Sequence, residues 1–340
     1  MVEQKEMNLT EDEAALYDRQ IRLWGLDAQK RLRAARVLLI GLQGLGAEIA
    51  KNIVLAGIKS LTLMDHTVVT EEDACSQFLI PRSKIGENRA EASVERTALL
   101  NPMVEVTADS SDIAEKDETF FQNFDVVCAT NLIKDQLLRI NSICHENKIK
   151  FFAGDVFGYH GFMFADLNEH EYAEETIKKK KESGEASAKK AKMQEEETVV
   201  SKKSMSFVRL KEALAVDWSS ENMSKLLKKV PKTFFIIQVL LRFRAQYKRD
   251  PSPKSKEEDI VNLLKLRDQV LEELKISKDF VDDSFASYCF AELSPVCAIV
   301  GGVFGQEIIK AVSQKDAPHN NFFFFNGLDG SGMVDCIGNS

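Results

Sequence analysis

RVLLIGLQGLGAEIAKNIVLAG, residues 36–57, is the stretch that decides the fold. The apolar run from Val37 to Ile40 predicts a short buried strand, and residues 47–56 predict a helix that ends near Gly57. Glycines connect the two elements. A strand that turns through glycines into a helix is typical of α/β proteins, in which the helix N-terminus can bind a phosphate. The stretch therefore predicts the first strand–helix unit of an α/β sheet.

The same alternation continues to about residue 155. Apolar runs at 60–65, 125–130 and 148–155 predict three more strands, and the segments 87–100 and 132–146 predict helices between them. Strands that alternate with helices at this spacing predict an α/β fold class with a mainly parallel sheet.

An amphipathic segment, residues 14–34, precedes the first strand. Its apolar residues recur at helical spacing and predict a single helix with one buried stripe: Tyr17, Ile21, Trp24, Ala28 and Leu32. Arg19 lies two residues after Tyr17, which is about 200° around a helix that turns about 100° per residue. Arg19 is therefore predicted to point away from the buried stripe.

Residues 168–288 depart from the α/β pattern and are predicted to form an inserted, mostly helical segment, with helices at 234–247 and around 260–274. Within it, residues 176–204 contain almost no large apolar side chains and carry blocks of like charge, which predicts a disordered lysine-rich loop. The lysines at 178–181, 189, 190 and 192 match a nuclear-import patch. A solvated loop also explains them, and the sequence leaves both interpretations open.

Residues 289–340 are predicted to return to the α/β unit. A helix at 294–312 contains Gly301, Gly302 and Gly305, which would allow another backbone to approach closely. The end of the chain reads as two strands around a glycine-rich turn.

Composition excludes several classes of protein. The net charge of −8 argues against a nucleic-acid binder. The longest apolar run, 295–305, is shorter than the roughly 20 residues that a membrane-spanning helix needs. The N-terminus is polar and acidic, unlike a secretory signal or transit peptide. The six cysteines form no C-x-x-C pair, so we expect a reducing compartment and no metal site.

The glycine loop by itself is ambiguous. Gly41, Gly44 and Gly46 are present, and Asp65 ends the next strand 24 residues after Gly41, a suitable distance for a ribose contact. Gln43 stands where a G-x-G-x-x-G pattern has its second glycine, and its side chain would obstruct a phosphate. A nucleotide site and a purely structural turn both remain open, and so does a dehydrogenase, although the five histidines form no catalytic constellation.

Four stretches carry a resemblance to a known family. They are YDRQIRLWG at 17–25, the stretch at 36–57, FFAGDVFGYHGFMFADL at 151–167 and PHNNFFFF at 318–325. With them, nearly the whole chain resembles the small-subunit family of SUMO-activating enzymes (E1), within the wider ThiF/MoeB-like adenylation family. The resemblance implies a Rossmann-like adenylation fold. Residues 1–167 would form the N-terminal part of an inactive adenylation domain, 168–288 the insertion and 289–340 the return.

The resemblance also implies a function. Such enzymes adenylate the C-terminal glycine of a ubiquitin-like protein with Mg-ATP, capture it as a thioester on a cysteine and pass it to a conjugating enzyme (E2). In the SUMO enzyme only the larger subunit has a complete ATP site and the cysteine. We therefore expect a heterodimer with the larger catalytic subunit, which binds ATP and Mg²⁺, and SUMO and E2 contacts through the complex. The isolated chain is expected to be inactive, with no cofactor of its own, in the nucleus and also the cytoplasm.

Departures from the motifs of active members support this division of roles between the two subunits. Gln43 replaces a glycine of G-x-G-G-x-G, and Thr67 replaces the second acid of D-x-D. Further substitutions fall at the two asparagines and the arginine of N-x-N-R-Q-F, at a downstream lysine and at the magnesium-binding acid: Asp73, Cys75, Ser76, Arg89 and Leu132. By the resemblance, Gly41, Gly44, Gly46 and Asp65 are a non-functional remnant of a cofactor site.

No cysteine lies between Cys144 and Cys289, where the family places its thioester-forming cysteine. Cys289 and Cys297 flank the start of an apolar helix and are predicted to be buried. We therefore expect no thioester on this chain.

Arg19 is the candidate catalytic residue. By the resemblance, the first arginine of Y-D-R-Q crosses to the partner and contacts the ATP phosphates there, which suits a guanidinium because it is always charged and can bind phosphate through two donors. The residues alone equally allow Arg19 to pair with an acid on its own surface, and Arg22 is a weaker candidate. A purely structural dimerisation subunit and a self-sufficient nucleotide enzyme remain alternative functions.

Overall fold

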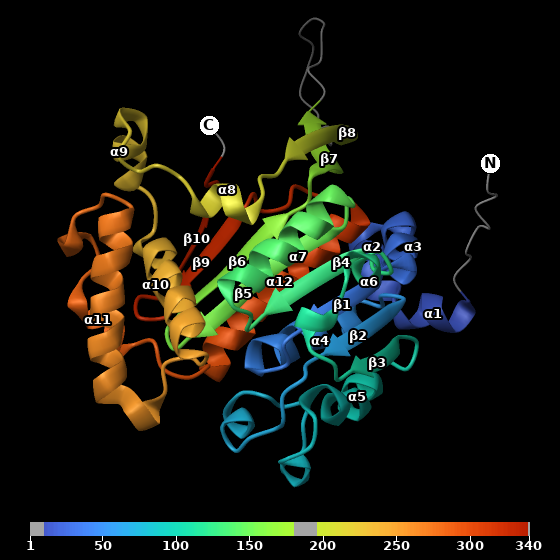
Figure 1. Ribbon diagram of the computed structural model, residues 1–340. Helices are drawn as coiled ribbons and strands as arrows, with labels where there is room; N and C mark the ends of the chain where they lie inside the picture. The colour runs from blue at the N-terminus through green and yellow to red at the C-terminus, as the bar shows by residue number, and fades with distance from the viewer. Residues whose placement is uncertain (1–9, 180–195, 339–340) are drawn as a thin grey trace, which may run out of the picture.

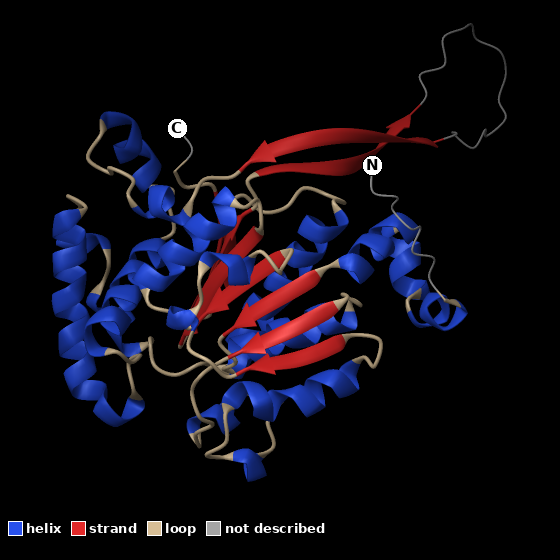
Figure 2. Ribbon diagram, turned by 45° about the vertical axis from the view of Figure 1, so that its right-hand side comes forward, coloured by secondary structure: helices blue, strands red, loops and turns tan. Residues whose placement is uncertain are grey.

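An eight-stranded sheet runs through the molecule in the order β10-β9-β6-β5-β4-β1-β2-β3 (Figure 2). The computed structural model describes residues 10–179 and 196–338. The strands of this sheet are β1 (Arg36–Ile40), β2 (Ser60–Met64), β3 (Glu105–Asp109), β4 (Val126–Thr130), β5 (Lys150–Phe157), β6 (His160–Asp166), β9 (Phe322–Asn326) and β10 (Ser331–Asp335). β3, β2, β1, β4 and β5 pair in parallel, whereas β6, β9 and β10 join through antiparallel pairs. The predicted mainly parallel α/β sheet is confirmed.

Helices cover both faces of the sheet (Figure 1). One face packs against α4 (Gly44–Leu55) and α12 (Ser294–Ser313), and α5 (Arg89–Leu100) lies beside α4. The other face packs against α7 (Lys134–Glu146) and α10 (Lys232–Tyr247), and α11 (Lys256–Glu273) packs against α10. The remaining short helices are α6 (Glu118–Phe121), α8 (Leu210–Leu214) and α9 (Glu221–Leu227), with 3₁₀ turns η1 (Glu72–Cys75), η2 (Arg82–Lys84), η3 (Ile113–Glu115), η4 (Pro253–Ser255), η5 (Lys278–Phe280) and η6 (Asp283–Ser287).

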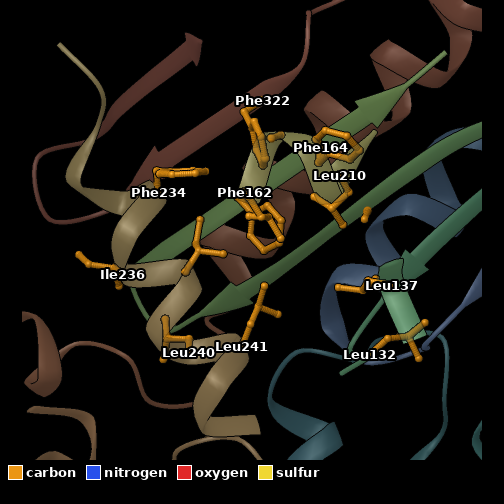
Figure 3. Packing of buried hydrophobic residues seen from close by; sticks show 14 of the residues in the cluster. Leu132, Leu137, Phe162, Phe164, Leu210, Phe234, Ile236, Leu240, Leu241 and Phe322 are labelled. Carbon is orange, nitrogen blue, oxygen red and sulfur yellow. The ribbon is translucent and has the colours of Figure 1, made fainter. Parts of the chain in front are cut away.

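The helices of the inserted segment share a core with the sheet. Phe164 of β6 and Phe322 of β9 have ring centroids 4.9 Å apart, and Phe234 of α10 lies 5.7 Å from Phe322 (Figure 3). Rings at these distances bury large apolar areas and favour edge-to-face packing. The insertion therefore completes the hydrophobic core on one face of the sheet.

α12 is a core helix. Its length and composition match those of a membrane-spanning helix, but 61% of the matching stretch is buried inside the protein. A Cβ at Gly301 would lie 2.5 Å from Cβ of Glu48, and one at Gly305 would lie 2.6 Å from Cβ of Asn52, so both glycines let α12 approach α4 closely. Gly302 faces open space, so the close approach predicted for it is wrong.

The N-terminal segment is broken into three helices, α1 (Glu11–Leu16), α2 (Asp18–Trp24) and α3 (Leu26–Ala34), so the predicted single helix over 14–34 is wrong. Gly25 ends α2 with φ +89°, a conformation that other residues rarely adopt. Tyr17 is buried at the first break, where its hydroxyl accepts a hydrogen bond from Asn101.

The predicted loop at 176–204 also needs correction. Its described residues belong to two long antiparallel strands, β7 (Glu169–Lys179) and β8 (Glu196–Ser206), which stand out from the body (Figure 2). The segments TI at 176–177 and TVV at 198–200 supply β-branched residues, and pairing satisfies the backbone groups that each strand turns towards the other without an apolar core. Residues 180–195, which carry most of the lysines of the import hypothesis, lie outside the described residues.

Candidate functional site

The glycine turn joins the carboxyl end of β1 to α4, with Gln43 as the N-cap residue. Gly41 has φ +84°, and a Cβ there would lie 2.4 Å from the carbonyl oxygen of Thr130 in β4. A Cβ at Gly46 would lie 2.1 Å from the carbonyl oxygen of Gly41. Both glycines are thus required by contacts within the chain, whether or not a ligand binds.

Glu292 fills the place in front of α4. The backbone N–H of Gly44 donates a hydrogen bond to Oε2 of Glu292, and a Cβ at Gly44 would lie 2.9 Å from that oxygen and 2.4 Å from Cβ of Ser76. The N-terminus of the helix after the first strand is where α/β proteins bind nucleotide phosphates. In this chain a carboxyl group of its own occupies that position.

Asp65, the predicted ribose partner, is buried and already bonded. Its Oδ2 accepts from the backbone N–H of Leu42 at 2.9 Å and from Nη1 of Arg89 at 3.1 Å, and its Oδ1 accepts from the backbone N–H of Thr67 at 3.0 Å. Nη2 of Arg89 also donates to Asp73 at 3.2 Å. Arg89 therefore links two buried carboxylates, which leaves Asp65 little capacity for a sugar hydroxyl.

A cavity of about 290 Å³ opens beside this turn. Its charged lining consists of Glu72, Asp73, Arg89, Asp250 and Glu292. The basic groups around it already have acidic partners, because Arg89 pairs with Asp65 and Asp73, Lys254 with Glu72, and Arg244 with Asp155 and Asp250. Phosphates need positive charge for neutralisation, and among the described residues the charge of these basic groups is already offset by their acidic partners.

The cavity at the position expected for a nucleoside is small, and apolar side chains line one side of it. A cavity of about 50 Å³ lies next to Asp65, Thr67 and Leu132, whereas ligand pockets usually measure about 300–1,000 Å³. Leu132, which the resemblance places at the position of the magnesium-binding acid, is buried in the core cluster with Leu137 (Figure 3). Among the described residues, no group of three or more His, Cys, Asp or Glu side chains is placed to hold a metal ion.

Burial raises the pKa of Glu292 to about 8, and the nearby charges of Asp155 and Asp250 act in the same direction. The backbone N–H groups of Gly44 and Leu45 lower it, but they do not offset burial. The raised pKa favours the protonated, neutral form of Glu292 near neutral pH.

This raised pKa predicts a pH-dependent stability. A carboxyl group whose folded pKa exceeds its unfolded value of about 4.5 binds its proton more tightly when folded, so stability falls as pH rises towards about 8. Glu292→Gln removes the titration. Between pH 6 and 8 we expect the wild-type protein to lose about 2 kcal/mol of unfolding free energy relative to this variant. Urea unfolding at both pH values measures the difference, and parallel pH profiles would contradict it.

Arg19 lies on α2 and is exposed, which confirms that it points away from the buried stripe. It makes no hydrogen bond or ion pair within residues 10–179 and 196–338, whereas Arg22 pairs with Asp18 at 3.0 Å. Among these residues, no acidic side chain of the same chain pairs with Arg19, whereas Arg22 does have such a partner.

Arg19 cannot reach the glycine turn of its own chain. Gln20 beside it donates to the carbonyl of Leu55, at the C-terminal end of α4, whereas the turn lies at the N-terminal end. A helix of 12 residues spans about 18 Å. Figure 2 shows the parallel strands pointing away from the N-terminal helices. Arg19 therefore does not reach a nucleotide placed at the glycine turn of its own chain.

The cysteines separate into two groups. Cys128, Cys144, Cys289 and Cys297 are buried, and burial raises the pKa of each thiol, which makes them poor nucleophiles. The predicted burial of Cys289 and Cys297 is confirmed. Cys75 and Cys336 are exposed, and Cys75 lines the larger cavity.

Sequence reasoning missed Glu292, Asp250 and Arg244 as members of this site. Glu292 is 248 residues from Gly44 along the chain, and no local motif marks it. The one usable signal is that Glu292 stands just before Ser294 and Pro295. Proline is favoured in the first turn of a helix, so this pair marks the start of one.

Comparisons with known proteins agree with this fold. Residues 17–336 match the model of the ThiF family. "SUMO-activating enzyme subunit 1" of Xenopus tropicalis is 56% identical over 99% of both chains, and that of Homo sapiens is 55% identical over 99% of both. The protein of the same name from Danio rerio is 55% identical over 98% of this chain and 97% of its own. A crystal structure of E. coli MccB with succinimide superposes with a TM-score of 0.54 at 12% identity, covering 96% of this chain and 72% of that one.

Proposed function

The chain belongs to the ThiF family and is a SUMO-activating enzyme subunit of the subunit 1 type, and from this premise we propose that it is the regulatory, non-thioester-forming member of a heterodimer that supplies Arg19 in trans to its partner. The larger catalytic subunit adenylates SUMO, forms the thioester and passes SUMO to the E2. The single observation that carries the proposal is an exposed arginine without a partner among the described residues, placed far from a site that its own chain has filled.

The surface around Arg19 supports a role at a subunit interface. Leu23, one helical turn after Arg19, is 70% exposed, and Leu16 and Leu26 are 52% and 46% exposed. Several large apolar side chains exposed together mark an interaction surface, because water solvates them poorly. An arginine held on such a surface is desolvated when a partner covers it, which strengthens its attraction to phosphate.

The residues around this chain's own glycine turn support the proposal that the partner subunit, and not this chain, binds the cofactors. Arg89 links Asp65 to Asp73, Glu292 fills the front of α4, and Leu132 offers no oxygen side chain for magnesium. We therefore assign ATP and Mg²⁺ to the larger subunit and expect the isolated chain to be inactive. The lysine cluster at 178–192 supports a nuclear location in addition to a cytoplasmic one.

Reconstitution with the larger subunit, SUMO and Mg-ATP tests the proposal. We expect the SUMO thioester only on the larger subunit, and the double variant Cys75→Ser, Cys336→Ser of this chain should form it at an unchanged rate, because its other four thiols are buried. Non-reducing electrophoresis shows which subunit carries SUMO. A thioester on this chain would contradict the proposal, and ATP–pyrophosphate exchange by the isolated chain would favour the self-sufficient enzyme.

A further inference from the structure

Glu292 contacts the part of the fold that would hold a nucleotide's phosphates. Its Oε2 accepts the hydrogen bond of the Gly44 N–H at the start of α4, a helix of 12 residues. The first N–H groups of a helix have no partner within the helix and carry partial positive charge. A phosphate placed there in a nucleotide-binding protein would need the same N–H groups and the same space.

The chain is shaped to receive this carboxyl group. A side chain at Gly44 would collide with Cβ of Ser76 and approach Oε2 of Glu292 to 2.9 Å. The position whose missing side chain would let the backbone approach a phosphate holds Gln43 in this chain. At the neighbouring Gly44, the absence of a side chain lets Glu292 and Ser76 approach.

The backbone holds Glu292 in this place. Gly158 forms a β-bridge with Glu292, and its N–H donates to the carbonyl of Ala291 at 2.6 Å. On the other side, Ser294 begins α12 and its hydroxyl donates to the carbonyl of Cys75 at 2.8 Å. These contacts fix the backbone on both sides of Glu292 and place its carboxyl group within reach of the Gly44 N–H.

Space and polar groups remain behind Glu292. The cavity of about 290 Å³ that it lines approaches the lower limit of about 300 Å³ for ligand pockets. Nε of Arg89 lines the same cavity, is buried and has no hydrogen-bond partner among the described residues, although Asp73 Oδ1 lies 3.1 Å away. A small anion that replaced the carboxyl group would meet the α4 N–H groups on one side and this guanidinium on the other.

We propose that Glu292 is the residue that closes this chain's phosphate position, and that its carboxyl group, bound to the start of α4, decides that only the partner's site binds nucleotide. The inference rests on the proposed function in one respect, namely that the partner subunit binds the nucleotide. It predicts a latent site for inorganic phosphate or pyrophosphate that appears when the carboxyl group is removed.

The test uses the full chain, with Glu292→Ala to open the position and Glu292→Gln to keep it filled with a neutral group of the same shape. Thermal unfolding is followed against sodium phosphate or pyrophosphate, with sodium chloride at matched ionic strength as reference. For Glu292→Ala we expect a saturable rise in the unfolding midpoint of about 2 °C or more, because a ligand that binds only the folded state stabilises it. The wild-type protein and Glu292→Gln should follow the chloride reference.

Two results overturn the proposal: Glu292→Ala that follows chloride, or a wild-type protein that responds to phosphate as strongly as Glu292→Ala. Glu292→Ser is a second opening variant if the alanine variant does not fold. Adding Gln43→Glu to Glu292→Ala returns a carboxyl group to the cavity wall and should abolish the response, which assigns the binding to this position. The assay contains neither SUMO nor the larger subunit, so its failure is distinguishable from failure of the E1 proposal.

Discussion

Arg19→Ala in the reconstituted heterodimer is expected to slow SUMO-dependent ATP–pyrophosphate exchange about 100-fold while the two subunits still co-purify. A positioned donor to charge that develops in a transition state contributes about 10²- to 10³-fold, and arginine fingers contribute about 10³- to 10⁵-fold to transfer of a terminal phosphoryl group. Adenylation takes place at the α-phosphate, so we expect the lower end. Arg19 has no internal partner among the described residues, and its loss should therefore leave the fold of this chain unchanged.

Arg22→Ala is the matched control. Arg22 lies one turn later on the same helix and is equally solvent-exposed, but it pairs with Asp18. Its loss removes an exposed ion pair worth about 0–1 kcal/mol and should leave exchange within about twofold of wild type. An unchanged rate for Arg19→Ala would reject the arginine-in-trans role and favour a purely structural subunit. Equal losses in both variants would point to a general effect of charge on this helix.

The second large effect concerns Arg89. Arg89→Met is expected to destabilise the chain by about 3–5 kcal/mol, because it leaves Asp65 and Asp73 buried without their cation. All three side chains are less than a tenth exposed, so water cannot replace the lost contacts. Urea unfolding of the full chain measures the change, since the midpoint shifts with stability at constant slope.

Arg36→Met provides the comparison for this measurement. Arg36 also pairs with an aspartate, Asp125, but the two side chains are 41% and 43% exposed. Solvent screens such a pair, and its loss should cost less than about 1 kcal/mol. A loss for Arg89→Met no larger than for Arg36→Met would mean that the Asp65–Arg89–Asp73 cluster does not stabilise the fold, and that Arg89 serves another purpose.

The local elements were predictable because their signals are local. Apolar runs and glycines a few residues apart predicted a strand at 37–40 and a helix at 47–56, and the structure confirms both elements as β1 and α4. The sequence did not predict β3. It is an edge strand in which no residue is buried, so it lacks the run of apolar residues that marks a buried strand. The hairpin β7–β8 was misread as a loop because its strands pair with each other and need no apolar face.

Part of the candidate site was also readable from the sequence. The substitutions Gln43, Thr67 and Leu132 predicted a degraded nucleotide site through the resemblance to the family's motifs, and helical spacing predicted that Arg19 faces away from the buried stripe. The break at Gly25 could not be foreseen, because one glycine is compatible with a helix until its φ is known.

The sequence by itself determined the α/β fold class, the absence of a cysteine between Cys144 and Cys289, and the direction of Arg19, and through the family resemblance it predicted the loss of phosphate and magnesium ligands. Tertiary structure alone decided what stands in the place of the lost ligands: Arg89 between Asp65 and Asp73, and Glu292 in front of α4. Periodicity and motifs report on residues within a turn or two of each other. Glu292 and Gly44 meet only because α12 packs along α4 and brings residues 248 positions apart to the same end of one helix.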